Sequence, residues 1–486
     1  MIKKVAQLFF VPSPGAGHQV STIEFTRRLL DRDPRLSITI INIQSPFAPP
    51  ATNNSKTASE DPSAIQFINL PILEQLPPLE YLKQAPEKYL SEFIASYLPH
   101  VRDVISKAAD SSVPVAGLVV DMFCSEMVEL AKEFGLPCYM FFTSGVAFLA
   151  LMDYLPEHYD KTGHHFGPTD PDTIIPGYRK PFPAAVIPPF LRRETGFVNF
   201  SEHAKRLRGI TGVMVNSVTE LEPYPVHSLS DRKFPPVYTV GPVLDLIGQA
   251  HSHNSNRAQH NHIMGWLDAQ PKSSVVYLCF GSMGFMHEAQ VREVGSGLLK
   301  SGARFLWAVK KPGGIGLPAD YTEEELKAIL PAEFWATVES GQGVLCKWAP
   351  QVEVLAHEAV VGFVSHCGWN STLEALWFGR PIVTWPMYAE QNCNAFQLVE
   401  EMGLGINLRL SYNRDGDDLV TGDELENAIR RLMIPGNDVA IKAREAGETS
   451  RKALLEGGSS YESVGRFIKD IIEPLVQTAV YQENGK

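Results

Sequence analysis

Two apolar patterns take turns along most of the chain. Short, continuously apolar runs rich in β-branched and aromatic residues are separated by longer segments in which apolar residues recur every three or four positions. The first pattern is typical of strands buried on both faces of a sheet, and the second of amphipathic helices. Because the two alternate, the pattern predicts an α/β fold with parallel sheets covered on both faces.

The first half of the chain contains one such series. We expect buried strands at 5–11, 36–43, 65–70, 115–121 and 138–144, and helices at 18–33, 86–109 and 125–135. A proline-rich stretch from about 156 to 200 interrupts the pattern and predicts a long surface excursion beside a cleft. The strand–helix alternation resumes at 212–222.

A second series follows a polar, aperiodic segment rich in His and Asn, which we interpret as a linker at 241–262. The expected strands of this series lie at 274–281, 304–309, 343–348, 361–366 and 381–387. The chain then ends in helical segments from 421 onward. Two series with one layout predict two doubly wound, Rossmann-like domains that face each other across a cleft.

Composition narrows the class of protein without changing this picture. The 486 residues exceed what one core usually holds, and 44% hydrophobic and 20% charged residues are an ordinary globular balance. A net charge of −12 argues against a nucleic-acid or anionic-membrane partner. Six scattered cysteines without a C-x-x-C pair favour buried free thiols over disulfides or zinc.

The N-terminal stretch "MIKKVAQLFFVPSPG" is like a signal peptide only superficially, because proline and glycine soon interrupt its apolar run. No apolar stretch approaches the ~20 residues that span a bilayer. We therefore expect a cytoplasmic protein without stable membrane insertion, and a monomer as the default.

Hydrogen-bonding side chains gather in one predicted strand-to-helix turn, "SHCGWNSTLEA" (Ser365–Ala375). Gly368 permits close backbone approach, Asn370 and Ser371 are typical first-turn residues, and His366 adds a ring N–H. Such turns at the carboxyl ends of parallel strands receive anions, so the stretch is compatible with a diphosphate site. Taken alone, an ordinary helix cap explains it equally well.

Residues at neighbouring strand ends favour the ligand interpretation. Trp348 offers a flat apolar face, Glu374 lies one turn into the helix that the turn opens, and Glu390 with Gln391 stand where a helix begins after the next strand. A stacking ring, a carboxylate for diol hydroxyls, a phosphate turn and an acid–amide pair match the parts of a nucleotide sugar.

The segment Trp348–Gln391, "WAPQVEVLAHEAVVGFVSHCGWNSTLEALWFGRPIVTWPMYAEQ", resembles the signature box of plant UDP-sugar-dependent glycosyltransferases of family 1. The likeness extends over nearly the whole chain. It implies a GT-B architecture, in which the last helix returns to the N-terminal domain. We accordingly divide the chain into an acceptor-binding domain, a linker, a UDP-sugar-binding domain and a returning helix, at 1–240, 241–262, 263–460 and 461–486.

The resemblance also implies a role for the residues of the box. Trp348 stacks on uracil and Ala349 reads the base through its backbone, while the ribose hydroxyls bind to Gln351 and Glu374. The diphosphate is held by Ser282, His366, Asn370 and Ser371. The sugar is contacted by Trp369, Glu390 and Gln391. A final glutamine is similar to glucose-using members, so UDP-glucose is the expected donor.

A second strand-to-helix turn, "PSPGAGHQV" (12–20), lies in the other half and contains His18. Asp121 ends another strand there, so the two side chains are expected above one sheet. An aspartate that accepts the imidazole N–H fixes the tautomer and stabilises the imidazolium. A lone histidine is more often a cap or core residue, but the family resemblance supports His18 as general base and Asp121 as its partner. Val20 stands where a dinucleotide fingerprint needs its third glycine, which argues against a nicotinamide-dependent oxidoreductase.

The expected reaction is inverting transfer of glucose from UDP-glucose to a hydroxyl of a small lipophilic acceptor, giving a β-O-glucoside. Resemblance to broad-acceptor enzymes of plant secondary metabolism places phenolic or flavonoid acceptors first and terpenoids or hormones next. The alternative is a non-catalytic nucleotide-sugar or small-molecule binder on the same scaffold. The presence of His18 and Asp121 together with an intact signature box argues against this alternative.

We expect no metal and no cofactor, because UDP-glucose is a co-substrate and the 366–371 turn meets the charge that grows on the diphosphate. The Asp-x-Asp pairs at 31/33, 170/172 and 415/417 are interpreted as solvated loop acids. Thr143, near a strand end, is a candidate sugar contact. Candidates for the acceptor pocket, several of which are equally compatible with core positions, are Gly17, Phe123, Phe142, Phe148, Phe182 and Tyr388.

Overall fold

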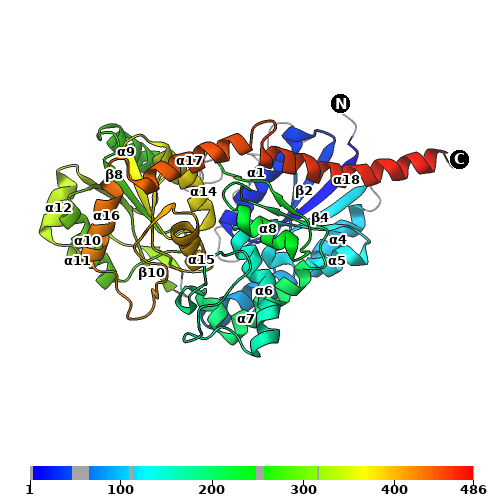
Figure 1. Cartoon of the computed structure of the whole chain (residues 1–486), viewed down its shortest axis with the longest axis horizontal. Helices are drawn as coiled ribbons and strands as arrows, with labels where there is room; N and C mark the ends of the chain where they lie inside the picture. The colour runs from blue at the N-terminus through cyan, green and yellow to red at the C-terminus, as the bar shows by residue number, and fades with distance from the viewer. Residues whose placement is uncertain (1–3, 46–64, 109–112, 248–256, 315–316, 485–486) are drawn as a thin grey trace.

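The computed structural model describes residues 4–45, 65–108, 113–247, 257–314 and 317–484. The chain folds into two lobes, each built around a parallel sheet, and helices α14 (Trp369–Trp377) and α15 (Gln391–Phe396) lie at the boundary between them (Figure 1). The predicted α/β fold class with two doubly wound domains is confirmed.

The first lobe contains a seven-stranded sheet within the described residues, in the order β3-β2-β1-β4-β5-β6-β7, and each pair in the order is parallel. Its strands are β1 Ala6–Val11, β2 Leu36–Asn42, β3 Ile65–Asn69, β4 Val115–Asp121, β5 Cys138–Phe142, β6 Gly212–Val215 and β7 Val237–Thr239. Its helices are α1 Ala16–Arg32, α2 Tyr81–Gln84, α3 Pro86–Ala95, α4 Leu98–Ala108, α5 Met127–Glu133, α6 Val146–Thr162, α7 Glu194–Leu207 and α8 Pro223–Asp231.

The second lobe contains a parallel sheet in the order β12-β9-β8-β13-β14-β15, together with the antiparallel hairpin β10–β11. Its strands are β8 Val275–Cys279, β9 Arg304–Ala308, β10 Lys310–Pro312, β11 Pro318–Asp320, β12 Gly343–Cys346, β13 Val360–Ser365, β14 Ile382–Thr384 and β15 Gly405–Asn407. Besides α14 and α15, its helices are α9 Arg257–Asp268, α10 Glu288–Ser301, α11 Glu323–Ile329, α12 Ala332–Glu339, α13 Gln351–Ala356, α16 Gly422–Met433 and α17 Asp438–Ala453.

The strand order places the two candidate ligand-binding turns, 12–20 and 365–375, at the points where the strand order of each sheet reverses. In the first lobe β1 lies between β2 and β4, and in the second lobe β8 lies beside β13. The loops that follow β1 and β13 leave the sheet next to these switch points. In open α/β sheets, crevices for ligands form there.

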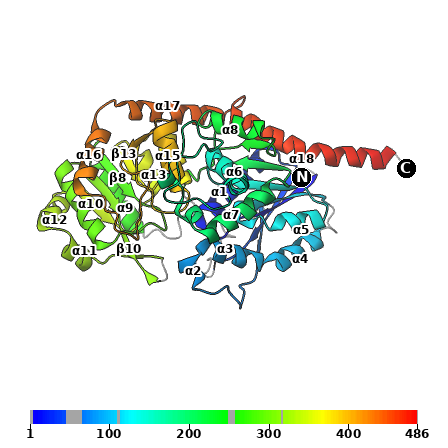
Figure 2. The same ribbon diagram turned by 60° about the horizontal axis from the view of Figure 1, so that its bottom comes forward.

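Helix α18 (Ser459–Asn484) follows α17 and runs along the first lobe (Figures 1 and 2). Its apolar side chains share a core with β1, β2 and β4, and the ring of Phe467 packs edge-on against Tyr139, with centroids 5.1 Å apart. Tyr238 Oη donates a hydrogen bond to Asp470 of the helix, with an O···O distance of 2.6 Å. The last helix therefore holds the end of the chain against the N-terminal sheet.

The proline-rich stretch differs most from its prediction. Helix α6 continues to Thr162 and α7 begins at Glu194, so both ends of the predicted excursion are helical. Between them Phe166, Ile175 and Phe182 are buried in the core of the first lobe. The prediction of a surface excursion was wrong for these residues, because short 3₁₀ turns and a single β-bridge erase the apolar period while the side chains still face inward.

Smaller differences follow from short elements. The expected helix at 86–109 is divided into α3 and α4, and β7, β10, β11 and β15, each of three residues, were not predicted. Residues 248–256 of the expected linker lie outside the described residues, and 257–262 belong to α9. Among the described helices, none combines the length and the hydropathy that crossing a bilayer requires.

Candidate active site

A cavity of about 830 Å³ lies between the lobes. Its wall comes from the loops that follow β1, β4 and β5 of the first sheet and β8, β12, β13 and β14 of the second. The carboxyl ends of both parallel sheets thus face one space, as the topology requires.

One side of the cavity carries an imidazole held by a carboxylate. His18, in the first turn of α1, places Nδ1 2.7 Å from Asp121 Oδ2, and Thr143 Oγ1 lies 3.0 Å from the same nitrogen. Asp121 is 3% exposed, and its other oxygen accepts the backbone N–H of Phe123 at 3.0 Å. Because Nδ1 donates to the carboxylate, Nε2 is the basic nitrogen of the ring.

The environment of His18 combines opposing effects on its pKa. Burial lowers the pKa, whereas the charge of Asp121, the hydrogen bond to it and the charge of Glu390 raise it, and the net pKa lies above the usual value. A neutral imidazole here accepts a proton readily, and Asp121 stabilises the resulting cation. The pair has the geometry of a general base and its orienting acid.

The opposite wall contains the turn between β13 and α14. His366 is 5% exposed and lies between two glycines: a Cβ at Gly281 or Gly368 would come within 2.5 Å of its Nε2. Burial lowers the pKa of His366 to about 4, so the ring is neutral near pH 7. Among the described residues, its Nδ1 has no hydrogen-bond partner, which is an unusual state for a buried polar atom.

Next to His366, three side chains form a connected group on α13 and α14. Gln351 Nε2 donates to Ser371 Oγ at 2.8 Å and to Glu374 Oε2 at 2.7 Å. Burial raises the pKa of Glu374 to about 7. Trp348 and Ala349 line the same wall just before α13. The structure therefore brings the predicted uracil and ribose residues together.

Asn370 and Trp369 make contacts that the sequence did not indicate, because both reach across to the first lobe. Asn370 Nδ2 donates to the carbonyl of Gly17 at 3.2 Å. Trp369 Nε1 donates to the carbonyl of Asn216 at 2.7 Å, and its indole ring packs on Gly145. Both residues line the cavity, but the indole N–H of Trp369 is occupied by the contact between the lobes.

Glu390 and Gln391, at the start of α15, also line the cavity. Glu390 Oε1 accepts from Ser144 Oγ of the first lobe at 3.1 Å. Gln391 Oε1 accepts the backbone N–H groups of Met387 and Tyr388, both at 2.9 Å, which fixes the orientation of its amide. The acid–amide pair is therefore held on the same cavity as His18.

Five of the six predicted pocket residues line the cavity: Gly17, Phe123, Phe142, Phe148 and Tyr388. Tyr388 lies on the second lobe, with its ring 6.0 Å from that of His366. Phe182 does not line the cavity. Its buried ring packs against Tyr178 and Phe396, with centroids 4.7 and 4.8 Å away, so its assignment to the acceptor pocket was wrong.

Several cavity residues were missed by the sequence analysis. Ser144, Lys310 and Lys347 all follow strand ends, and this position could have indicated them. Lys310 Nζ donates a hydrogen bond to the backbone carbonyl of Ser282, one of the predicted residues, at 3.4 Å. His260 lies in the segment interpreted as a linker, and its Nε2 is 2.9 Å from Glu353 Oε2. His260 does not follow a strand, so its position in the sequence did not indicate a place in the cavity.

The chain is similar to known proteins over nearly its whole length. A family model described as UDP-glucoronosyl and UDP-glucosyl transferase matches residues 196–437. UDP-glycosyltransferase 71K2 of Pyrus communis is 45% identical over 482 residues, covering 97% of this chain and 98% of the relative. Flavonol 3-O-glucosyltransferase UGT71C4 of Arabidopsis thaliana is 42% identical over 481 residues, covering 97% and 98%. The crystal structure of Medicago truncatula UGT71G1 complexed with UDP-glucose superposes with a TM-score of 0.88 at 42% identity, covering 96% of this chain and 98% of that one.

Proposed function

Because the chain belongs to the plant UDP-glycosyltransferases of family 1, enzymes with the GT-B fold, we propose that it transfers glucose from UDP-glucose to a hydroxyl of a small lipophilic acceptor. Phenolic or flavonoid acceptors come first. The product is a β-O-glucoside formed with inversion. In this proposal residues 1–240 bind the acceptor and 263–460 bind the UDP-sugar.

The observation that carries the proposal is the position of the His18–Asp121 pair on one wall of a cavity whose other wall holds the donor box. His18 Nε2 removes the proton of an acceptor hydroxyl, and the oxygen attacks the anomeric carbon of glucose. The new C–O bond forms as the bond to the diphosphate oxygen breaks, and UDP leaves from the opposite face. The proton stays on the imidazole, which Asp121 stabilises.

The cavity wall formed by the second lobe, here called the donor wall, offers suitable groups for each part of UDP-glucose. The half-buried ring of Trp348 supplies a stacking face, and the group formed by Gln351, Ser371 and Glu374 supplies polar atoms for the ribose and the nearest phosphate. Because His366 is neutral, it would act as a hydrogen-bond donor to the diphosphate rather than as a cation. Glu390 and Gln391 would contact the hexose, and Thr143 lies beside His18 on the other wall.

A flavonoid acceptor is supported by the apolar rings near the base. The ring of Phe123 packs edge-on against His18 with centroids 5.7 Å apart. Phe142 and Phe148, whose ring centroids lie 6.1 Å apart, also line the cavity. A planar polycyclic phenol would bury its faces against such rings while one hydroxyl points at the imidazole. Two relatives are named as flavonol or flavonoid 3-O-glucosyltransferases.

The test is transfer by the His18→Ala variant, with UDP-glucose and a flavonol. Loss of a positioned base costs ~10²–10⁴-fold, so product measured by chromatography should fall by at least ~10²-fold. Calorimetric binding of UDP should stay within about threefold of the wild-type value. Near-normal turnover by the variant would contradict the assignment of His18. Wild-type UDP release that no acceptor accelerates would favour the non-catalytic binder instead.

A further inference from the structure

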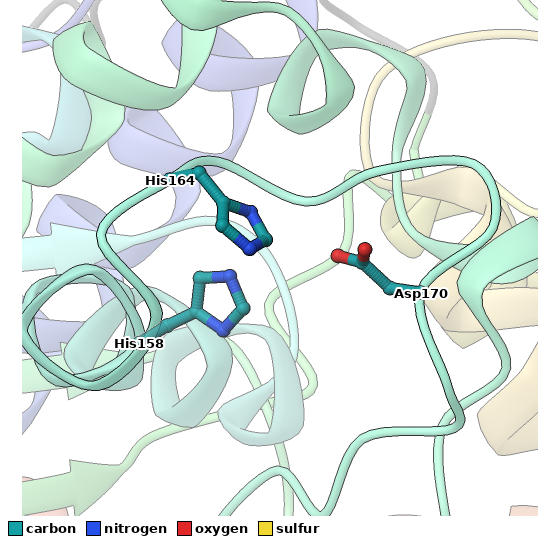
Figure 3. A group of neighbouring side chains, drawn as sticks. All are labelled: His158, His164 and Asp170. Atoms are coloured by element: carbon teal, nitrogen blue, oxygen red, sulfur yellow. The ribbon is translucent and has the colours of Figure 1, made fainter.

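A group of metal-ligand side chains lies at the end of α6, outside the cavity. His158 is in the last turns of the helix, His164 follows the helix cap Gly163, and Asp170 lies in the loop beyond. One ligand atom from each residue lies within 4.8 Å of the others. Figure 3 shows a ring nitrogen of each histidine turned toward the other ring, with the Asp170 carboxylate pointing toward the pair. None of the three lines the proposed active site.

His158 supplies an independent indication that something binds here. The residue is 4% exposed, and its Nε2 has no hydrogen-bond partner among the described residues. Leaving a buried polar atom without a partner is unfavourable, so such atoms are rare in native proteins and call for an explanation. The ring is fixed by Phe166, on which it stacks at 3.9 Å between centroids, and by the edge of Phe197. The unpaired nitrogen is therefore held in place.

The other two side chains are oriented by backbone groups. His164 Nδ1 lies 2.7 Å from the carbonyl oxygen of His165, so this nitrogen carries the proton and Nε2 keeps its lone pair. Asp170 Oδ2 accepts the backbone N–H of Gly167 at 2.7 Å. Partners of this kind orient the ligands of protein metal sites.

We propose that His158 Nε2, His164 Nε2 and Asp170 bind one Zn²⁺ ion, with a water molecule as the fourth ligand. Two imidazoles and a carboxylate are a common zinc ligand set, whereas magnesium and calcium prefer oxygen ligands alone. Zinc–ligand bonds of about 2.0–2.1 Å require ligand atoms about 3.3 Å apart. The group must therefore contract, and rotation of the exposed His164 side chain, next to Gly163, would allow this.

The bound ion would connect the end of α6 to the loop through Asp170. That loop is part of the proline-rich stretch, whose Phe166 and Phe182 pack in the first-lobe core. Zinc would therefore stabilise this part of the lobe. Because the site lies outside the cavity, the transfer chemistry does not depend on it.

The first measurement is titration calorimetry of ZnCl₂ into the full, tag-free chain after chelator treatment. We expect one ion per chain with a Kd in the micromolar range or tighter, and His164→Ala and Asp170→Asn should each weaken binding by about tenfold or more. Both altered residues are at or near the surface, so the variants should fold. His227→Ala is the matched control, because His227 lies 3.4 Å from Asp231 in an exposed pair without a third ligand.

A second measurement reads the ligand geometry directly. Co²⁺ in the zinc site should give the intense visible absorption of a tetrahedral complex, and His164→Ala should abolish it. Zinc should also raise the Tm of the wild type but not that of the variant. The proposal would be overturned by absence of zinc binding in the wild type, by binding that persists when His164 and Asp170 are both replaced, or by loss of binding in His227→Ala.

Discussion

The pKa of His18, the proposed base, depends on charges from both lobes. Burial lowers the pKa of His18, and Asp121 of the same lobe and Glu390 of the other raise it above its usual value. Since the base works in its neutral form, kcat/KM should fall as the pH drops through this raised pKa. Glu390 contacts Ser144 across the cleft, so the basicity of His18 depends partly on the approach of the two lobes.

The Asp121→Asn substitution tests whether Asp121 raises the pKa of His18 and supports its proposed role as the base. The substitution removes the charge and the charged hydrogen bond that raise the pKa of His18, so the acidic limb of the kcat/KM profile should move to lower pH. The rate at the plateau should fall by ~10²-fold, because the amide no longer stabilises the imidazolium or fixes the tautomer. A purely structural role would lower the amount of active enzyme and leave the limb where it is. Activity against pH in the wild type and the variant separates the two.

Gly368→Ala tests the proposed role of His366. Gly368 has a φ of −61°, so alanine causes no backbone strain, but its Cβ would lie 2.5 Å from His366 Nε2. Displacement of the ring should raise the KM for UDP-glucose by about tenfold, equivalent to ~1.4 kcal/mol. Gly265→Ala, on α9 with open space around the added methyl, is the control and should leave KM unchanged. An unchanged KM in Gly368→Ala would argue against His366 as a donor ligand.

Residues at strand ends could be predicted, whereas contacts between lobes could not. His18 follows one recognisable buried strand and Asp121 ends another, and a hydrogen bond joins the two side chains in the structure. Ser144 also follows a strand, but its partner Glu390 is on the other lobe, and a sequence does not say which surfaces of two domains meet. The sequence pattern pairs Asp170 only with Asp172, because no local spacing connects it to histidines on a preceding helix.

At the scale of elements, one buried carboxylate joins two helix termini. Glu222 is 1% exposed and accepts the backbone N–H groups of Val146 and Ala147 at the start of α6, both at 2.9 Å. It also accepts Gln397 Nε2, at 2.7 Å, from the π-helical turn that follows α15. A negative charge at a helix N-terminus is favourable. Glu222 thus links α6, the helix that carries Phe148, to the π-helical turn that directly follows α15.

Replacement of Glu222 by Gln should lower stability rather than chemistry. The amide keeps the shape but loses the charge that strengthens several buried hydrogen bonds, a loss of about 2 kcal/mol that lowers Tm by a few degrees. Differential scanning calorimetry measures the shift. Glu220→Gln, exposed and two positions away, should change stability by less than ~0.5 kcal/mol. Equal Tm values for Glu222→Gln and the wild type would contradict the proposed link.

Element type was predictable where burial imposes a clear period. The strands at 36–42 and 115–121 are buried along most of their length, and the continuous apolar runs indicated both. Strand β15, of only three residues, is too short to show any period, whereas the three residues of β14 lie within a longer apolar run. The stretch between α6 and α7 buries side chains from 3₁₀ turns, so its core role was hidden from a rule that reads helices and strands alone.

At the scale of the whole molecule, the same segments bind the donor in our proposal and hold the lobes together. Trp369 and Asn370, in the first turn of α14, bond to Asn216 and Gly17 of the first lobe. A ligand that settles on this turn would act on the lobe contacts at the same time. We infer that binding of UDP-glucose to the second-lobe wall is coupled to the approach of the first lobe, which carries His18.

This arrangement also predicts how the enzyme responds to chelators. The residues that line the cavity include Lys310, Lys347 and the start of α14, which would supply positive potential and N–H donors for a leaving diphosphate. Excess chelator should therefore leave the initial rate of glucosyl transfer unchanged, although it removes zinc from the proposed site at His158. A Tm that falls on chelation while the rate at 25 °C stays constant would separate the two sites. If transfer is lost on chelation and magnesium restores it, the diphosphate requires a cation after all, and the assignment of charge stabilisation to this turn is wrong.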